Sequence, residues 1–222
     1  MKPLTVSINT LYWPNTDPSI VKAHTDVMGH LGLEVNYTID QRNHGQWMDA
    51  VMEHIDADII CFLDIDCVPT NTNVFDDAVQ WVAKNKTFMG ISQVSNHIKP
   101  CSHIFAAPAF LMIWRKTWQE MNKPTFQEVP NCDIAENMSY MAEMMGIHYK
   151  TLFPTHYYKR PEGERWFLHS YGEYGIGTHF EGGIFHLYQG RLPQNQKLFK
   201  KVCKSIIDGK FSTDKMKDSR EI

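Results

Sequence analysis

The sequence predicts an α/β fold: one open mixed sheet with helices on both of its faces. Short apolar and β-branched runs alternate with segments of helical periodicity through residues 4–63, which is the pattern of such folds. The last of these runs, residues 58–63, is apolar on both faces, as a covered parallel strand should be. With 222 residues and 43% apolar content, the chain can bury one sizeable core.

Turn and breaker residues divide the first part of the chain into β-α-β-α-β. Pro14 and Asn15 close the first strand, Gly32 ends the first helix, and His44 and Gly45 open the second helix. In order, we expect a strand at residues 4–11, a helix at 20–31, a strand at 33–39, a helix at 44–55 and a strand at 58–63.

The remaining elements follow from the same signals. We expect a helix at 75–84, a strand at 87–92, a strand at 109–114 leading into a helix with Trp118 and Met121, a helix at 133–145 ended by Gly146, and an amphipathic helix at 194–207. The helix at 133–145 is expected to pack through a face formed by Met138, Met141, Met144 and Met145. Residues 161–190 are rich in Gly, His and aromatics without clear periodicity, which predicts a loop that covers a site.

Charge is distributed unevenly along the chain, whose formal net charge is −3. Residues 195–222 hold eight Lys or Arg and four Asp or Glu, whereas residues 1–194 hold fourteen and twenty-one. We therefore divide the chain into a main domain at 1–193 and a basic helix and tail at 194–222. The body has no general attraction to polyanions, but the tail can contact one.

The cysteines and the hydropathy pattern favour a cytoplasmic protein. The five cysteines form no C-x-x-C pair and no zinc-ligand spacing, so reduced and mostly buried thiols are expected at Cys61, Cys67, Cys101, Cys132 and Cys203. The sequence has no apolar run long enough for a signal peptide or a membrane span. We therefore expect no integral membrane contact; the oligomeric state is not predicted.

The strongest chemical signal is the pair Asp64 and Asp66 at the end of the apolar strand. Residues two apart on a strand point to the same face, so their carboxylates should lie side by side at the ligand-binding edge of the sheet. At about 6 Å and an effective dielectric near 20 they repel by about 3 kcal/mol. A divalent cation offsets this repulsion, and oxygen ligands favour Mg²⁺ or Mn²⁺. The alternative is a solvated turn that caps the following helix.

The segment from Phe62 to Pro69 resembles the DxD segment of GT-A-fold glycosyltransferases, in which an apolar strand delivers the two aspartates. Other segments resemble GT-A features in the expected order: the first strand at 6–13, the glycine turn at His44 and Gly45, the acceptor-side strand and helix at 106–118, the acidic helix start at 132–137 and the late histidine segment at 183–188. The resemblance implies a GT-A-like, Rossmann-like single domain.

The resemblance also implies a nucleotide-sugar donor, with a UDP-sugar the expected one, and Mn²⁺ or Mg²⁺ as the cation. It places donor contacts at Thr10, Leu11, Tyr12 and Asp64, metal ligands at Asp64, Asp66 and His186, and the catalytic base of an inverting reaction at Asp133 or Glu136. Arg191 is a further candidate for the diphosphate, because a guanidinium binds phosphate through two hydrogen bonds.

Each of these assignments has a structural alternative. Asp133 and Glu136 have the spacing of a capping box, His186 can be a hydrogen-bonded core residue, and Arg191 a solvated loop arginine. His179 competes with His186 for the metal. Among the tryptophans, only Trp166 is expected to serve as an acceptor-side platform, while the others are assigned to the core.

Two other functions and several acceptors stay open. A nucleotidyltransferase acting on a sugar phosphate would use the same carboxylates, although the first loop, TLYWPNTDP, has no glycine and no basic residue to hold a triphosphate. A sugar-nucleotide-binding module without turnover is the other. The acceptor is not resolved: a glycan and a hydroxymethylated DNA base are the candidates, and proteins and small molecules stay open. For the DNA base, the short Met-rich chain is similar in style to phage-type DNA-modifying glycosyltransferases.

Overall fold

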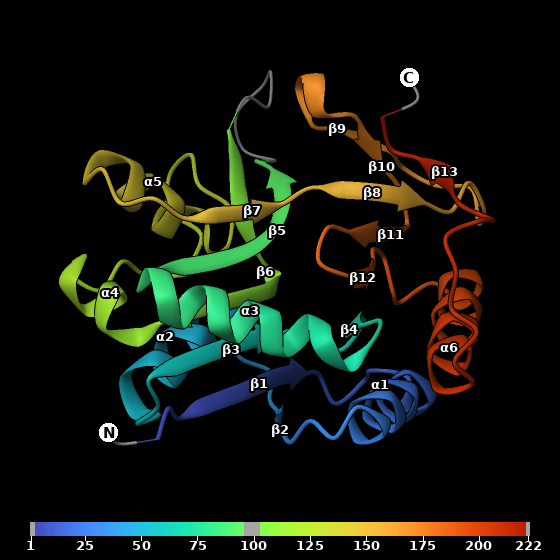
Figure 1. Cartoon of the computed structure of the whole chain (residues 1–222), viewed down its shortest axis with the longest axis horizontal. Coiled ribbons are helices and arrows are strands. Elements are labelled where there is room, and N and C mark those ends of the chain that lie inside the picture. The colour runs from blue at the N-terminus through green and yellow to red at the C-terminus, as the bar shows by residue number, and fades with distance from the viewer. Residues whose placement is uncertain (1–2, 96–102, 221–222) are drawn as a thin grey trace.

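The computed structural model describes residues 3–95 and 103–220 and has the α/β architecture that the sequence predicts (Figure 1). A six-stranded sheet has the order β2-β1-β3-β6-β5-β7. Its strands are β1 (Val6–Tyr12), β2 (Val35–Ile39), β3 (Ile59–Leu63), β5 (Phe88–Val94), β6 (Ile104–Trp114) and β7 (Lys150–Leu152). The sheet is mixed, because β6 runs antiparallel to β3 and β5 while the other pairs are parallel.

Helices cover both faces of this sheet, as predicted. They are α1 (Pro18–His30), α2 (His44–His54), α3 (Thr72–Asn85), α4 (Arg115–Glu120), α5 (Glu136–Met144) and α6 (Pro193–Ile207). The fully buried strand β3 shows the two layers, since Cys61 packs with α3 on one face and Phe62 packs with α2, α4 and α5 on the other. Successive side chains of a strand point to opposite faces, so an all-apolar run fits this position.

A second, five-stranded antiparallel sheet lies beside the first (Figure 1). The expectation of a loop at 161–190 is therefore wrong, because this segment contributes strands to the second sheet. Its order is β13-β8-β11-β12-β4, and its strands are β4 (Cys67–Pro69), β8 (Pro154–Tyr157), β11 (Gly177–Phe180), β12 (Ile184–Leu187) and β13 (Lys217–Asp218). A two-stranded ribbon, β9 (Trp166–Phe167) with β10 (Glu173–Tyr174), and a 3₁₀ turn (His169–Tyr171) fill the rest of that segment.

Several other bounds differ from the expectation. The aspartate pair is followed by the short strand β4 and only then by a helix, β6 begins at Ile104, and α5 begins at Glu136. On α5, Met138 is buried but Met144 is 81% exposed, so the expected packing face does not extend to the end of the helix. Cys61, Cys67, Cys132 and Cys203 are buried free thiols, as predicted; Cys101 lies outside the described residues.

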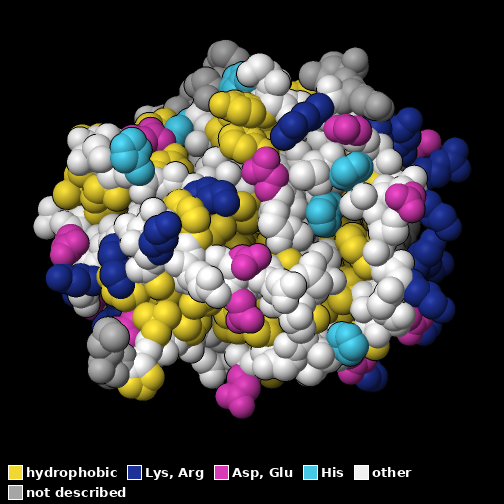
Figure 2. Space-filling view, in the orientation of Figure 1, with side chains coloured by type: hydrophobic (Ala, Val, Ile, Leu, Met, Phe, Trp, Pro, Cys, Tyr) yellow, Lys and Arg dark blue, Asp and Glu magenta, His cyan; other side chains and the backbone are white. Residues whose placement is uncertain are grey.

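The C-terminal helix α6 packs its apolar side on α1 and the second sheet. Leu198, Phe199 and Val202 join Ile20 and Val27 in one buried cluster. The lysines of α6 face outward, and Figure 2 shows Lys and Arg side chains in a column along the edge of the molecule where α6 lies. No helix in the described ranges combines the length and the apolar character that a membrane span needs.

Candidate metal and nucleotide site

Asp64 and Asp66 lie in a tight turn between the two sheets. The Asp64 N–H donates to the Ala109 carbonyl of β6 (3.0 Å), and its carbonyl accepts from the Cys67 N–H (2.9 Å). The carboxylates therefore converge because the chain turns between β3 and β4, and not because both residues stand on one straight strand. The expectation that the two carboxylates converge is confirmed, but the expected reason, their position two residues apart on one strand, is wrong.

His186 reaches the aspartates because β12 pairs with β4. In the register of this pair, His186 lies opposite Cys67, and the Leu187 N–H donates to the Asp66 carbonyl (2.9 Å). The His186 Nε2 is 3.5 Å from the Asp66 Oδ1. One ligand atom from each of Asp64, Asp66 and His186 lies within 4.8 Å of the other two.

These three side chains fit a divalent cation. Ligands of one ion at about 2.1–2.2 Å stand at most about 4.4 Å apart, so small side-chain rotations from the observed separations bring the three atoms to bonding distance. Two carboxylates and an imidazole suit Mn²⁺ or Mg²⁺. The His186 Nδ1 is buried and has no hydrogen-bond partner among the described residues. The structure thus brings together the three residues that are predicted as metal ligands from the sequence.

His44 is a fourth side chain at this site that sequence reasoning did not identify as a site residue. It opens α2, where Asn43 caps the helix by accepting from the Gly45 N–H (2.9 Å), and its Nε2 is 3.6 Å from the Asp64 Oδ1. Each aspartate therefore faces one histidine. The sequence does contain a signal for His44, because this residue begins the helix that precedes the aspartate strand.

The electrostatics of the site favour an added positive charge. Burial raises the pKa of Asp64, His44 lowers it, Asp66 raises it further, and His186 lowers it; the net shift is upward. The upward shift of the pKa means that the site disfavours the ionised form of Asp64 unless a further positive charge is present. Gly190 limits the position of the other carboxylate, since a Cβ on Gly190 would stand 2.4 Å from the Asp66 Oδ2.

A cavity of about 640 Å³ opens directly in front of the aspartates. Its walls come from the end of β1 and the turn after it, the first turns of α1, the start of α2, the aspartate turn, the segment before α6 and the first turn of α6. The lining residues are Leu11, Tyr12, Trp13, Asn15, Thr16, Asp17, Ile20, His44, Asp64, Ile65, Asp66, Gln189, Gly190, Arg191 and Gln196. A volume of this size is in the range of small-molecule and cofactor sites.

The predicted donor contacts divide into two groups in the structure. Leu11, Tyr12, Asp64 and Arg191 line the cavity, whereas Thr10 is fully buried and does not. The Thr10 hydroxyl is buried and has no hydrogen-bond partner in the part of the chain that the structure describes. Of the tryptophans, Trp13 lines the cavity and is 53% exposed, contrary to its assignment to the core.

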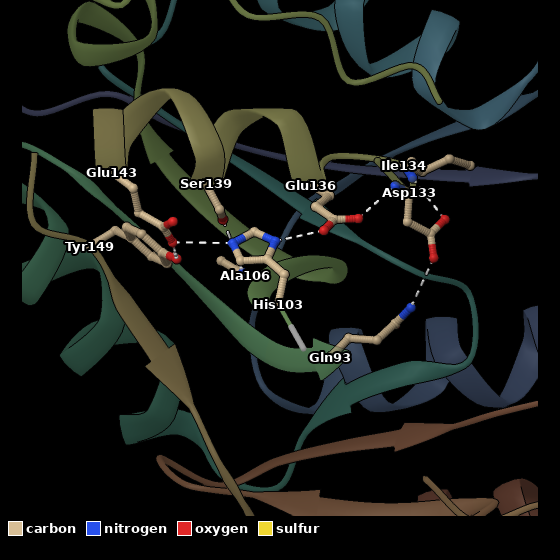
Figure 3. A network of polar contacts seen from close by, with 9 residues as sticks. All are labelled: Gln93, His103, Ala106, Asp133, Ile134, Glu136, Ser139, Glu143 and Tyr149. Carbon is tan, nitrogen blue, oxygen red and sulfur yellow. Dashed lines mark hydrogen bonds and ion pairs between the residues drawn. The ribbon is translucent and has the colours of Figure 1, made fainter. Parts of the chain in front are cut away.

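Asp133 and Glu136 lie in a separate polar network around His103 (Figure 3). One Glu136 oxygen is 2.6 Å from the His103 Nδ1, and the other accepts from the Asp133 N–H at 2.7 Å. The Asp133 carboxylate accepts from the Ile134 N–H (2.8 Å) and from the Gln93 amide (3.5 Å). Neither Asp133 nor Glu136 is among the residues that line the cavity.

The network distinguishes the two candidate bases. Glu136 is fully buried; burial alone would raise its pKa, but hydrogen bonds from His103, the Asp133 N–H and Ser95 outweigh burial and lower the pKa. Asp133 is partly exposed. The capping box forms only by half, since Glu136 reaches back to the Asp133 N–H while the cap position of α5 falls on Ala135, with φ 66°.

The remaining nominated side chains have structural partners. The His179 Nδ1 is 2.7 Å from the Thr155 hydroxyl, and His179 is not part of the metal-ligand group. Burial, and to a lesser extent His156, lowers the pKa of His179 to about 4. Trp166 packs against Tyr174 and Tyr188, with ring centroids at 5.4 and 5.0 Å.

No protein-family model and no curated protein sequence matches this chain. Solved structures similar in fold include a mannosyltransferase from Pyrobaculum calidifontis in complex with GDP-Man and Mn²⁺, at 10% identity and TM-score 0.49, over 68% of this chain and 55% of that one. A Drosophila galactosyltransferase 7 is similar at 14% identity and TM-score 0.40, over 65% of this chain and 64% of that one.

A third similar structure is the 4-diphosphocytidyl-2C-methyl-D-erythritol synthase of Anaerococcus prevotii, at 8% identity and TM-score 0.44, over 68% of this chain and 89% of that one. The chain thus spans about half to two thirds of the length of the two sugar transferases. Identities this low concern the fold alone.

Proposed function

We propose that this chain is a metal-dependent glycosyltransferase that moves a sugar from a nucleotide-sugar donor to an acceptor hydroxyl. The observation that carries the proposal is the convergence of Asp64, Asp66 and His186 within 4.8 Å of one another, with both aspartates in the wall of a cavity of about 640 Å³. A cation held there faces the space that a nucleotide diphosphate would fill.

Each residue then has a defined task toward the donor. Asp64, Asp66 and His186 hold Mn²⁺ or Mg²⁺, which when bound neutralises the charge of the departing diphosphate. Arg191, which lines the same cavity two residues before α6 begins, contacts the diphosphate. Tyr12 and the exposed Trp13 offer aromatic faces to the nucleoside, for which a UDP-sugar is the first donor to test.

The acceptor side of the reaction requires a base. As the acceptor oxygen forms its bond to the anomeric carbon, the bond from that carbon to the diphosphate breaks, and the acceptor proton must leave. Of the two candidates we assign this proton to Asp133, which does not line the cavity but is partly exposed, whereas Glu136 is fully buried. Glu136 holds the Asp133 backbone instead. The reaction is then inverting, with a glycan or a hydroxymethylated DNA base as the candidate acceptor.

The first rival reaction is nucleotidyl transfer to a sugar phosphate. Enzymes of that kind must hold a triphosphate, which requires several cationic or backbone contacts. Among the described residues that line the cavity, Arg191 is the single Lys or Arg, and the turn after β1 contributes no basic side chain. This composition favours a diphosphate donor.

The test is a panel of nucleotide sugars with Mn²⁺ or Mg²⁺, scored first by melting temperature and then by release of nucleoside diphosphate. Ligand binding raises the melting temperature through linkage. The proposal predicts a metal-dependent shift and metal-dependent release. Turnover of a nucleoside triphosphate with a sugar phosphate would instead identify a nucleotidyltransferase. A shift with no release from any donor, with every candidate acceptor present, would identify a binding module.

A further inference from the structure

A basic surface lies outside the cavity, on the outward side of α6 and the segment that follows it. We call it the lysine face and define it by five exposed residues: Lys197, Lys201, Lys204, Lys210 and Lys215. Figure 2 shows the corresponding column of Lys and Arg along the edge of the molecule where α6 and β13 lie in Figure 1. Its charge contrasts with the net charge of −3 of the whole chain.

Two of the five lysines are free to meet a partner. Within the described ranges, Lys197 and Lys201 have no ion pair or hydrogen bond from their side chains, whereas Lys204 pairs with Asp208 at 2.9 Å. Lys215 and Lys159, which follows β8, both line a hollow of about 520 Å³. Structural salt bridges therefore do not account for the lysine face.

The lysine face begins on α6 one residue after the wall of the candidate active site. Arg191 and Gln196 line the cavity in front of the aspartates, and Lys197 follows Gln196 on α6. From there Lys197, Lys201 and Lys204 extend about 10 Å along the helix axis at 1.5 Å per residue. A DNA duplex carries about six phosphates over that length, so an extended polyanion lying on this face would have its backbone next to the cavity.

The apolar side chains distinguish a phosphate polymer from a membrane as the partner. A helix that binds lipid presents apolar residues beside its basic ones. Here the apolar side of α6, with Leu198, Phe199 and Val202, is buried in the protein. Met144, the last residue of α5, and Met145, which follows it, are exposed, and α5 lies on the far side of the molecule from α6 (Figure 1). Leu192, the cap residue of α6, is 37% exposed, but it precedes the lysine face, and residues 197–215 include no exposed large apolar side chain.

We propose that the lysine face binds the phosphate backbone of duplex nucleic acid. The binding itself is independent of the donor site. That the bound nucleic acid carries the acceptor hydroxyl rests on the proposed transferase function, and it would select the DNA base over the glycan. Because lysines act as point charges on phosphates, the affinity should depend on salt and little on base sequence.

The test measures fluorescence anisotropy of a labelled DNA duplex over a range of salt concentrations, without donor or metal. We expect binding whose logarithmic salt slope falls by about 2 when Lys197→Gln and Lys201→Gln are combined, since each phosphate contact contributes about 0.9. The matched control combines Lys84→Gln on α3 with Lys116→Gln on α4, two exposed lysines on other elements. The control should leave the slope unchanged.

Three results would overturn the proposal: no duplex binding even at low salt, an equal loss in the control, or preferential binding to phosphatidylserine–phosphatidylcholine vesicles with no binding to DNA. Metal-dependent binding of UDP is measured on the same variants and should not change. If UDP and donors are not bound while the duplex titrations behave as expected, the transferase function fails and the nucleic-acid surface stands.

Discussion

At the scale of single residues, the position of Asp66 depends on the absence of a side chain at Gly190. A Cβ at that residue would lie 2.4 Å from the Asp66 Oδ2, closer than any unstrained contact. The carboxylate would have to turn away from His186, although its chemistry would be unchanged. Gly190→Ala therefore separates the placement of a metal ligand from its identity.

We expect Gly190→Ala to weaken Mn²⁺ binding by about 10- to 100-fold, the effect typical of disturbing the groups that orient a ligand. Isothermal titration with Mn²⁺ measures this. Gly29→Ala is the matched control, because a Cβ at Gly29 has open space in helix α1 and alanine favours helices. Equal Mn²⁺ affinity in both variants would show that Gly190 does not constrain the site.

The residues that the sequence could and could not identify differ in a definite way. Asp64 and Asp66 were recognisable because a local pattern, a carboxylate pair after an apolar strand, carries the chemistry. His44 and Gly190 act through residues far away in the chain: the His44 Nε2 is 3.6 Å from the Asp64 Oδ1, and a Cβ at Gly190 would lie 2.4 Å from the Asp66 Oδ2. No local pattern encodes such contacts, so a single sequence does not reveal them.

At the scale of elements, the first sheet was predictable and the second was not. The strands β1, β2 and β3 alternate with helices and pair in parallel with near neighbours, so periodicity identified them. The strands β11 and β12 have four residues each and are buried on nearly every position. Short strands without alternation, joined by glycines, look like loops until their distant partners β4 and β8 are known.

The turn between β11 and β12, the strand that carries His186, contains two glycines, Gly182 and Gly183. Both have positive φ, 73° at Gly182 and 83° at Gly183. A Cβ at Gly183 would lie 2.7 Å from the Val74 Cγ2, whereas at Gly182 the nearest atom is at 3.9 Å. Gly182→Ala therefore introduces backbone strain alone, and Gly183→Ala adds a clash with α3.

Urea denaturation should show that Gly182→Ala lowers the free energy of unfolding by about 1–2 kcal/mol, the cost of the left-handed conformation for alanine. Gly183→Ala should cost about 1–3 kcal/mol more, because overpacking adds to the strain. If the free energy of unfolding falls by the same amount in both variants, the turn does not pack closely against α3 at Gly183.

At the scale of the whole molecule, buried histidines make stability depend on pH. Burial lowers the pKa of His24 to about 3 and, with His156, that of His179 to about 4. In the unfolded chain both titrate near their ordinary value of about 6.5. Below that pH the unfolded state takes up protons that the folded state does not, so the free energy of unfolding decreases as the pH falls from about 6.5 toward 4.

Each of the two histidines should reduce the free energy of unfolding by at most about 2 kcal/mol at pH 5 relative to pH 7. Denaturation curves at the two pH values measure the change. His179→Gln should remove its share of the pH dependence, while His148→Gln, at an exposed position, should not. A pH dependence that is identical in wild type and His179→Gln would contradict the assignment.

The fold class followed from the sequence because the β-α-β pattern and a doubly covered strand constrain the architecture of the whole molecule. The arrangement of the parts did not follow. The packing of α6 on α1 joins residues from the two ends of the chain, and only the folded structure places Arg191 and Gln196 in the wall of the cavity.

We propose above all that Asp64, Asp66 and His186 form one divalent-cation site. The most direct measurement is a titration with Mn²⁺, followed by electron paramagnetic resonance, on the wild type, on Asp66→Asn and on Asp76→Asn, which removes an exposed carboxylate of α3. We predict one site in the wild type that binds more tightly with UDP present, persists in Asp76→Asn and is lost in Asp66→Asn. Undiminished Mn²⁺ binding by Asp66→Asn would contradict the claim.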